Sequence, residues 1–182
     1  MSWIRVIAAA ALCASGCAGG QPPVAPPSPA PVAPDTSATD GERRADVVPV
    51  GCGESIGASG PVKMTGEFPA TTTPDQFTGK VTIIAGTAKI TGVTTPGADV
   101  YLARDGKIVS VPVPKDLVGR QVDIEPGGSA AFDAPGSARD CATDGQLAPG
   151  RYEIYAKIVL TEAEGSSMEA TGGPWPLEVI AE

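Results

Sequence analysis

Few residues of this chain could carry out chemistry, and the clearest pattern among them is residues 53–57, Gly-Glu-Ser-Ile-Gly. Its Gly-x-Ser-x-Gly spacing is that of a hydrolase nucleophile, which lies on a sharp turn between a strand and a helix and relies on a histidine base. The chain contains no histidine, and the flanking Cys52 and Gly60 favour a loop. A hydrolase that uses Ser55 is therefore kept only as the last alternative.

Two pairs of carboxylates, Asp123/Glu125 and Glu162/Glu164, have the spacing that places both members on one face of a strand. A glycosidase uses such a pair as acid and base. The second pair adjoins Gly165 and two serines, which is typical of a hairpin tip. We interpret these carboxylates as solvated surface charges.

Metal-ligating residues are scarce. The absence of histidine removes the commonest zinc and copper ligands. Asp133, Asp140 and Asp144 offer oxygen ligands suited to calcium, but the spacing of a calcium-binding loop is missing. The sequence therefore predicts no cofactor and no metal site, and calcium binding stays open.

Two aromatic residues are candidates for contact with a ligand. Trp175 lies between two prolines, and Tyr155 is expected to face outward from a strand. Both rings could stack on a sugar or a peptide. Alternatively, Trp175 plugs one end of the domain and Tyr155 makes a cross-strand contact between Glu153 and Lys157. An exposed Trp175 beside a concave face would favour ligand binding, and a buried one would favour a structural role.

The chain that must position these residues divides by composition. Residues 18–46 are first rich in proline and alanine and then polar, so they cannot bury a core and are expected to form an extended tether. Residues 47–182 are long enough for one core. The formal charge of −8 opposes nucleic-acid binding, and no basic cluster offsets it.

Residues 47–182 show strand patterns and almost no helical periodicity. The dipeptide Asp105-Gly106 predicts a two-residue hairpin turn. Residues 114–118 predict a single helical turn in a loop. The expected strands are 62–68, 80–85, 89–94, 100–104, 107–111, 121–124, 129–132, 151–161 and 177–180. This many short strands in one domain indicates an all-β antiparallel sandwich or barrel.

Residues 147–152, Leu-Ala-Pro-Gly-Arg-Tyr, place a tyrosine after a tight turn at the start of the longest strand. This arrangement resembles the turn before the penultimate strand of immunoglobulin-like and fibronectin-like β-sandwiches. The resemblance implies a tyrosine corner at Tyr152, whose hydroxyl would bond to nearby backbone. An ordinary core tyrosine after a Pro-Gly turn is the alternative.

The N-terminal residues 1–17 resemble bacterial lipoprotein precursors. Arg5 precedes a short apolar run, which ends in Ala14-Ser15-Gly16-Cys17. The resemblance implies that residues 1–16 are a signal peptide and that Cys17 carries a diacylglyceryl group, so that residues 17–46 comprise the lipidated cysteine and the tether. Ordinary cleavage near Ala18 and secretion are the alternative.

Cysteine arithmetic agrees with lipidation. Of the four cysteines, Cys13 leaves with the signal peptide, and a lipidated Cys17 leaves Cys52 and Cys141 to form one disulfide outside the cytoplasm. Cys52 precedes the first strand, Cys141 lies in a loop, and no tryptophan lies between them. The disulfide is thus expected to staple the entrance of the domain to a late loop rather than to bridge two sheets.

Together these features predict a monomeric, non-catalytic binding or structural module that a lipid anchors to the extracytoplasmic face of the cell membrane. Its expected partners are the membrane, through the lipid, and an envelope protein or peptidoglycan. The whole chain resembles small lipoproteins of unassigned function from high-GC Gram-positive bacteria. The main alternative to this function is a secreted inhibitor or a domain that binds a peptide or a carbohydrate.

Overall fold

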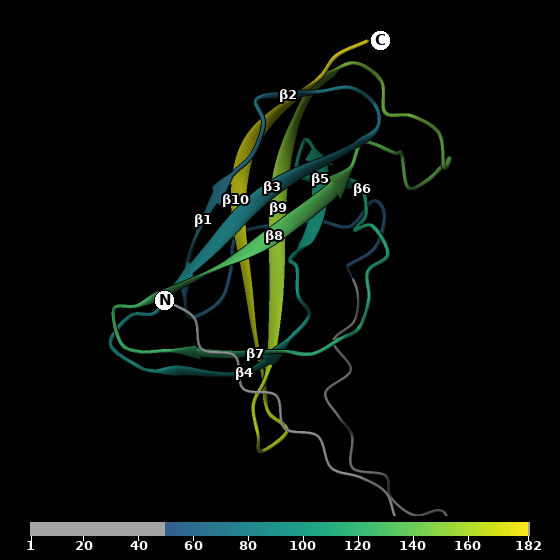
Figure 1. Cartoon of the computed structure of the whole chain (residues 1–182). Coiled ribbons are helices and arrows are strands. Elements are labelled where there is room, and N and C mark those ends of the chain that lie inside the picture. Colours follow the sequence, from purple (N-terminus) through teal and green to yellow (C-terminus); the bar gives the residue numbers. More distant parts are fainter. Residues whose placement is uncertain (1–49, 182) are drawn as a thin grey trace, which may run out of the picture. The chain divides into compact units, whose positions relative to one another are not determined.

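The computed structural model describes residues 50–181, so the predicted signal peptide, the predicted tether and Cys17 lie outside the described residues. The described part is all-β and contains ten strands in two facing sheets (Figure 1). The described residues include no helix long and apolar enough to cross a membrane.

The smaller sheet has three antiparallel strands in the order β1-β3-β8. Its strands are β1 (Lys63–Glu67), β3 (Gln76–Ile84) and β8 (Ser129–Ser137). The central strand β3 pairs along its whole length with β8, from Gln76 opposite Ser137 to Ile84 opposite Ser129.

The larger sheet has seven strands and is built around β9 (Gly150–Thr161), which pairs antiparallel with β10 (Ser167–Val179). The short β2 (Thr71–Thr72) joins the other side of β10 in parallel. Opposite β10, two hairpin-like pairs lie beside β9. They are β5 (Asp99–Arg104) with β6 (Lys107–Ser110), and β4 (Ile90–Thr94) with β7 (Arg120–Ile124).

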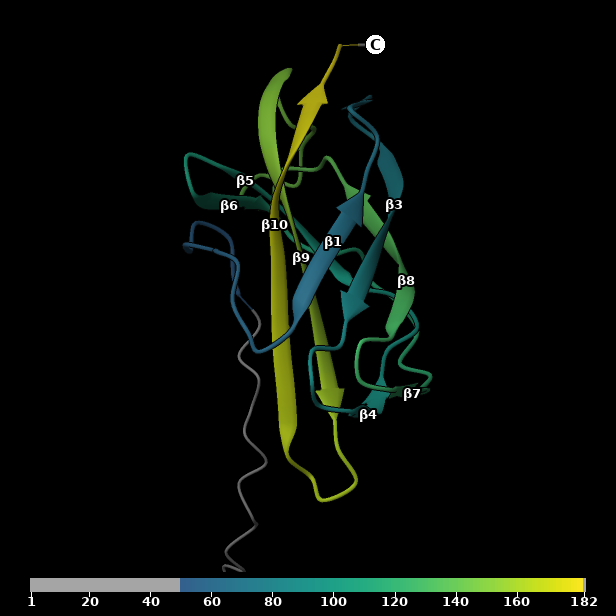
Figure 2. The same ribbon diagram turned by 90° about the vertical axis from the view of Figure 1, so that its left-hand side faces the viewer.

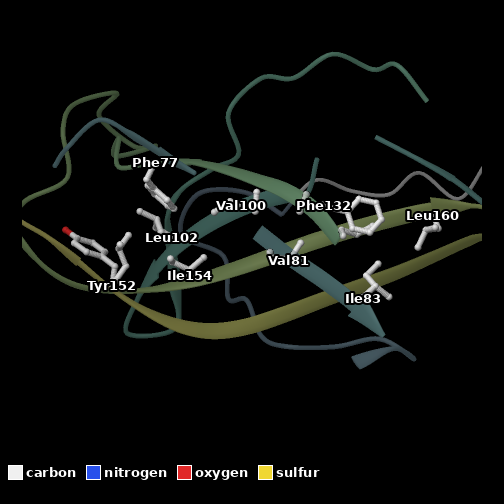
Figure 3. Close-up of a cluster of buried hydrophobic side chains, with 14 of the residues drawn as sticks. Phe77, Val81, Ile83, Val100, Leu102, Phe132, Tyr152, Ile154 and Leu160 are labelled. Atoms are coloured by element: carbon white, nitrogen blue, oxygen red, sulfur yellow. The ribbon is translucent and has the colours of Figure 1, made fainter. Parts of the chain in front are cut away.

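Alternating residues of the two sheets meet to form the main core (Figure 3). The period of two along each strand sends every second side chain inward. Near one end of the core, Phe77 and Leu102 lie close to Tyr152 and Ile154, and at the other end Ile83 and Phe132 lie near Leu160. Each of these side chains is at most 7% exposed.

Large aromatic rings lie over glycines on the inner faces of the strands. Trp175 on β10 lies so close to Gly66 on β1 that a Cβ atom at this glycine would be 2.7 Å from Trp175 Cε2. The ring of Phe68 occupies the space beside Gly79, and it stacks on Trp175 with a centroid separation of 5.3 Å. The side of the sandwich between β1 and β10, which run next to each other in Figure 2, is closed in this way.

The sequence patterns predicted the position of nearly every strand, and the all-β fold is confirmed. Asp105 and Gly106 form the predicted turn between β5 and β6, with φ values of 52° and 72° that suit a primed hairpin. Along the strand expected over residues 62–68, the alternate residues Val62, Met64 and Phe68 pack against the main core.

Two expectations about local structure are wrong. Residues 114–118 form no helical turn. Lys115 is held by Asp99, and Leu117 and Val118 stay exposed, so the segment has no buried apolar face that would stabilise a turn. The last strand begins at Ser167 rather than at Leu177. Its glycines and prolines are accommodated by an irregularity in the pairing with β9 between Gly172 and Trp175.

Candidate functional site

Residues 50–61 form a strap across the outer face of the seven-stranded sheet. At one edge of the sheet, Gly53 N–H donates to Ile108 O at 2.8 Å, and Ile108 N–H donates to Glu54 O at 2.9 Å. At the other edge, Ser59 and Thr171 exchange backbone hydrogen bonds of 2.9 and 2.8 Å. The strap therefore pairs with both β6 and β10 before the chain enters β1 in the opposite sheet.

The disulfide predicted between Cys52 and Cys141 is confirmed, with a Cα–Cα distance of 5.8 Å. It joins the strap to the loop between β8 and β9, where Cys141 N–H donates to Val109 O. The carboxylate of Asp140 shapes this loop by accepting hydrogen bonds from the backbone N–H groups of Ala142 and Thr143. These bonds, that of Thr143 first, lower the pKa of Asp140.

The strap buries the aromatic side chains on the outer face. Tyr155 on β9 lies opposite Tyr101 on β5, and the two are 6% and 3% exposed. Together with Ala103 and Ile108 they form a second apolar cluster, against which Val50, Ile56 and Cys141 pack. Tyr155 does lie on the outer face, but the strap covers it, so the ring is not exposed for a ligand. Its hydroxyl instead donates to Glu153 Oε2 at 3.3 Å, which agrees with the alternative of a contact within the sheet.

Charged residues border this cluster. Lys157, only 3% exposed, pairs with Glu169 at 2.8 Å. Asp99 lies opposite Lys157 in the pairing of β5 with β9 and is held at 2.8 Å by Lys115. Desolvation, followed by the charges of Asp99 and Glu169, raises the pKa of Tyr101 to about 12.

Stability at high pH is expected to depend on Tyr101. Because its folded pKa of about 12 lies above the ordinary tyrosine value of 10.0, the unfolded chain loses the phenolic proton first. The contribution to the free energy of unfolding is complete below pH 10 and is lost as the pH rises to about 12. The free energy of unfolding of the wild type and of Tyr101→Phe should be measured by urea denaturation from pH 9 to pH 12. Over this range, the wild type should lose roughly 2 kcal/mol of stability relative to Tyr101→Phe. A difference that is independent of pH would contradict this assignment.

Tyr152 lies at the start of β9 and is 4% exposed. Its hydroxyl donates to Ala148 O at 2.6 Å, which is the backbone bond expected of it. The guanidinium carbon of Arg104 lies 4.2 Å from the centre of its ring. These contacts fix the corner at which the chain passes from one sheet to the other.

Trp175 is half-buried and belongs to the wall between β1 and β10. Its packing on Gly66 and Phe68 agrees with the structural role that was the alternative for it, although the ring closes the side between β1 and β10 rather than one end of the domain. Much of the surface of the Trp175 ring is therefore in contact with other residues of the protein.

Ser55 does not lie on a nucleophile elbow. It is exposed in the strap, opposite Lys107, whose Nζ donates to Ser55 Oγ at 2.9 Å. Lysine serves as a general base where burial disfavours its charged form, and Lys107 is exposed. The described residues around Ser55 thus lack both the strand–helix turn and a desolvated base.

Replacing Ser55 by alanine removes one exposed hydrogen bond. The free energy of unfolding, measured by urea denaturation, should therefore change by no more than about 0.5 kcal/mol. Any cellular phenotype of the protein should also persist. A variant that keeps its fold but loses the phenotype would revive the hydrolase alternative.

Three of the four carboxylates in the two pairs have structural partners. Asp123 and Glu125 both bind Lys89, at 2.8 and 2.7 Å, and raise its pKa. Glu162 accepts a hydrogen bond of 2.7 Å from the hydroxyl of Ser166 in the turn between β9 and β10, as expected of a hairpin tip.

The three aspartates weighed as calcium ligands are not brought together. Asp140 and Asp144 lie in the loop after β8, whereas Asp133 lies within β8 beside Gly97. Within residues 50–181, no three cysteine, aspartate or glutamate side chains gather closely enough to hold a metal ion. A shallow hollow of about 230 Å³ lies beside Asp133 and is lined also by Gly97, Lys115 and Pro135.

Comparisons with known proteins add little to this geometry. No family model and no curated protein matches the sequence. Solved structures match only loosely. A Northeast Structural Genomics Consortium target is 15% identical, with a TM-score of 0.39, over 65% of this chain and 85% of its own. A β-glucosidase from Listeria innocua is 14% identical, with a TM-score of 0.35, over 67% of this chain and 16% of the enzyme.

Proposed function

We propose that this chain is a lipid-anchored, extracytoplasmic module of the cell envelope, whose β-sandwich binds or supports a partner without catalysing a reaction. The observation that carries the proposal is the disulfide between Cys52 and Cys141. Disulfides form mainly in oxidising compartments outside the cytoplasm. This bond also uses the two cysteines of the domain, which is the pairing that lipidation of Cys17 requires.

The strand order supports an immunoglobulin-like topology as the finer description of the sandwich. One sheet reads β1-β3-β8, and the other reads β2-β10-β9, beyond which β9 pairs with both β5-β6 and β4-β7. The chain contributes to the edges of both sheets before β3, since β1 pairs with β3 and β2 pairs in parallel with β10. The hydroxyl of Tyr152, bonded to the backbone at the corner between β8 and β9, has the geometry of a tyrosine corner.

The packing of the aromatic residues supports a structural role for them over the stacking of a ligand. Tyr155 is buried beneath the strap, and Trp175 packs between β1 and β10. A peptide- or carbohydrate-binding site built on these two rings therefore gains no support. We propose an envelope protein or peptidoglycan as the partner of a monomeric domain, and in-cell cross-linking of the anchored protein would identify it.

Replacing Cys17 by alanine tests the anchor. A cysteine carrying two or three acyl chains holds a protein stably at a membrane, whereas a single chain binds marginally. The variant should be released from cells or remain unprocessed, and it should partition into the aqueous phase of a detergent extraction. The wild type should partition into the detergent phase, with an acylated Cys17 at its N-terminus by mass spectrometry. A variant that follows the wild type into detergent would refute the lipid anchor.

A further inference from the structure

The strap and the main core are separate packing units. Among the described residues, every buried residue of the main core lies between Phe77 and Val179, and Val62 is the first that packs against it. The apolar contacts of the strap, through Val50 and Ile56, are made with the second cluster on the outer face. The sandwich therefore does not require the strap to fill its interior.

The strap is held weakly apart from its disulfide. Four backbone hydrogen bonds fasten it, two to Ile108 and two to Thr171, and one exposed side-chain bond joins Lys107 Nζ to Ser55 Oγ. Val50 and Ile56 are only half-buried, and most of the remaining strap residues are exposed. These contacts are opposed by the conformational entropy that the twelve ordered residues of the strap would regain on opening. Several of these residues are glycine, which gains the most freedom. Local opening is expected where few buried contacts oppose such an entropy gain.

The disulfide that closes the strap is accessible. Cys52 is exposed and Cys141 is half-buried, and exposed disulfides are those that thiols attack most readily. We infer that the Cys52–Cys141 bond is the latch of a redox-sensitive strap, and that its reduction releases residues 50–61 while the sandwich stays folded.

The chemistry requires a dithiol reductant. One thiolate of the dithiol attacks either sulfur of the Cys52–Cys141 bond, forms a mixed disulfide with that cysteine and releases the other. The second thiolate of the dithiol then attacks its own first sulfur in the mixed disulfide and releases the remaining protein cysteine. The protein disulfide gains two electrons and two protons and becomes two thiols, while the dithiol is oxidised to a disulfide. Reoxidation by a disulfide donor closes the strap again.

Opening would create a new surface on the seven-stranded sheet. Tyr101 and Tyr155, which lie opposite each other, would become accessible together with Ile108. The backbone groups of Ile108 and Thr171 that now bond to the strap would be free as well. The uncovered face thus presents two neighbouring aromatic rings, and at its two edges the backbone groups of Ile108 and Thr171 have no hydrogen-bond partner from the strap.

Hydrogen exchange of the purified protein tests this inference in three forms, oxidised, reduced with a dithiol, and C52S/C141S. In the last two forms, the amides of Ile108 and Thr171 should exchange at least about a hundredfold faster, near the rate of an unstructured peptide. The amide of Ala170, which alternation directs toward β9, should stay protected, as should those of Val81 and Ile83. Protection retained at Ile108 and Thr171, or lost throughout the chain, would overturn the inference.

Two further measurements separate the latch from a general loss of stability. In the reduced protein, the pKa of Tyr101 should fall from about 12 toward 10.0 in an ultraviolet titration, whereas oxidised protein keeps the high value. Ile56→Ala is the matched control, because it weakens the packing of the strap but leaves the latch closed. Its Ile108 amide should stay protected when oxidised. If Ile56→Ala opens the oxidised strap as fully as reduction does, the disulfide is not the latch.

Discussion

Replacing Tyr152 by alanine is expected to unfold the domain or nearly so. The side chain is 4% exposed, fills one end of the main core beside Phe77 and Ile154, and anchors the corner before β9 (Figure 3). Losing a buried aromatic side chain costs about 3–5 kcal/mol. Because domains of ordinary size are stable by about 5–15 kcal/mol, this loss is a large share of the whole. Urea denaturation followed by the fluorescence of Trp175 measures it.

Tyr152→Phe separates the two contributions of this residue. It keeps the ring in the core and removes only the hydroxyl that donates to Ala148 O. Such a hydrogen bond contributes about 1 kcal/mol, so the variant should fold with a modest loss of stability. If the free energy of unfolding of Tyr152→Ala were within about 1 kcal/mol of the wild-type value, packing at this corner would not stabilise the domain as described.

The second large effect is expected for Glu169→Gln. This substitution removes the charge that pairs with Lys157 at 2.8 Å and leaves the Lys157 ammonium, 3% exposed, without its partner. Breaking one side of a buried pair costs about 3–5 kcal/mol. Because the side chain of Glu169 is 41% exposed, water can offset part of the loss, and we expect a destabilisation of roughly 2–3 kcal/mol in urea.

Two variants serve as controls for the ion pair. Lys157→Met replaces the buried charge by an apolar side chain of similar length and should cost much less than Glu169→Gln. Glu125→Gln breaks an exposed pair, since Lys89 keeps Asp123 as a second partner, and should change the stability little. If Glu169→Gln had as little effect as Glu125→Gln, the burial of Lys157 would not be the source of the expected loss.

Local patterns in the sequence predicted most of the strands because each of these patterns depends on neighbouring residues, whereas the short β2 and the first half of β10 were missed. Alternation identified β1 and β9, and Asp105-Gly106 identified the hairpin between β5 and β6. The Pro-Gly turn before Tyr152 predicted the backbone hydrogen bond that its hydroxyl makes. Counting cysteines led to the disulfide, since the domain contains two.

Expectations failed where distant segments decide the outcome. Alternation placed Tyr155 on the outer face of its strand but could not show that residues 50–61 cover that face. The predicted disulfide was an overlooked signal, because joining Cys52 to Cys141 brings this segment beside the end of β8. A second signal was Tyr101, another aromatic at an outward position on the neighbouring strand.

The candidate site was less predictable than the fold. The pairing of Lys157 with Glu169 depends on the register of β9 with β10, and the first half of β10 was missed because its glycines and prolines argue against a strand. The helical turn expected at residues 114–118 failed for a similar reason. Propensity could not include the ion pair that draws Lys115 to Asp99.

The close packing of Trp175 on Gly66 has an evolutionary consequence. A methyl group at residue 66 would overlap the indole, so neither position can change freely while the other stays the same. In homologous sequences, the two sites should covary, with a larger residue at 66 accompanied by a smaller one at 175. The same covariation is expected between positions 79 and 68, where the Phe68 ring lies beside Gly79. Such paired changes would allow distant relatives to be recognised even where few residues are shared.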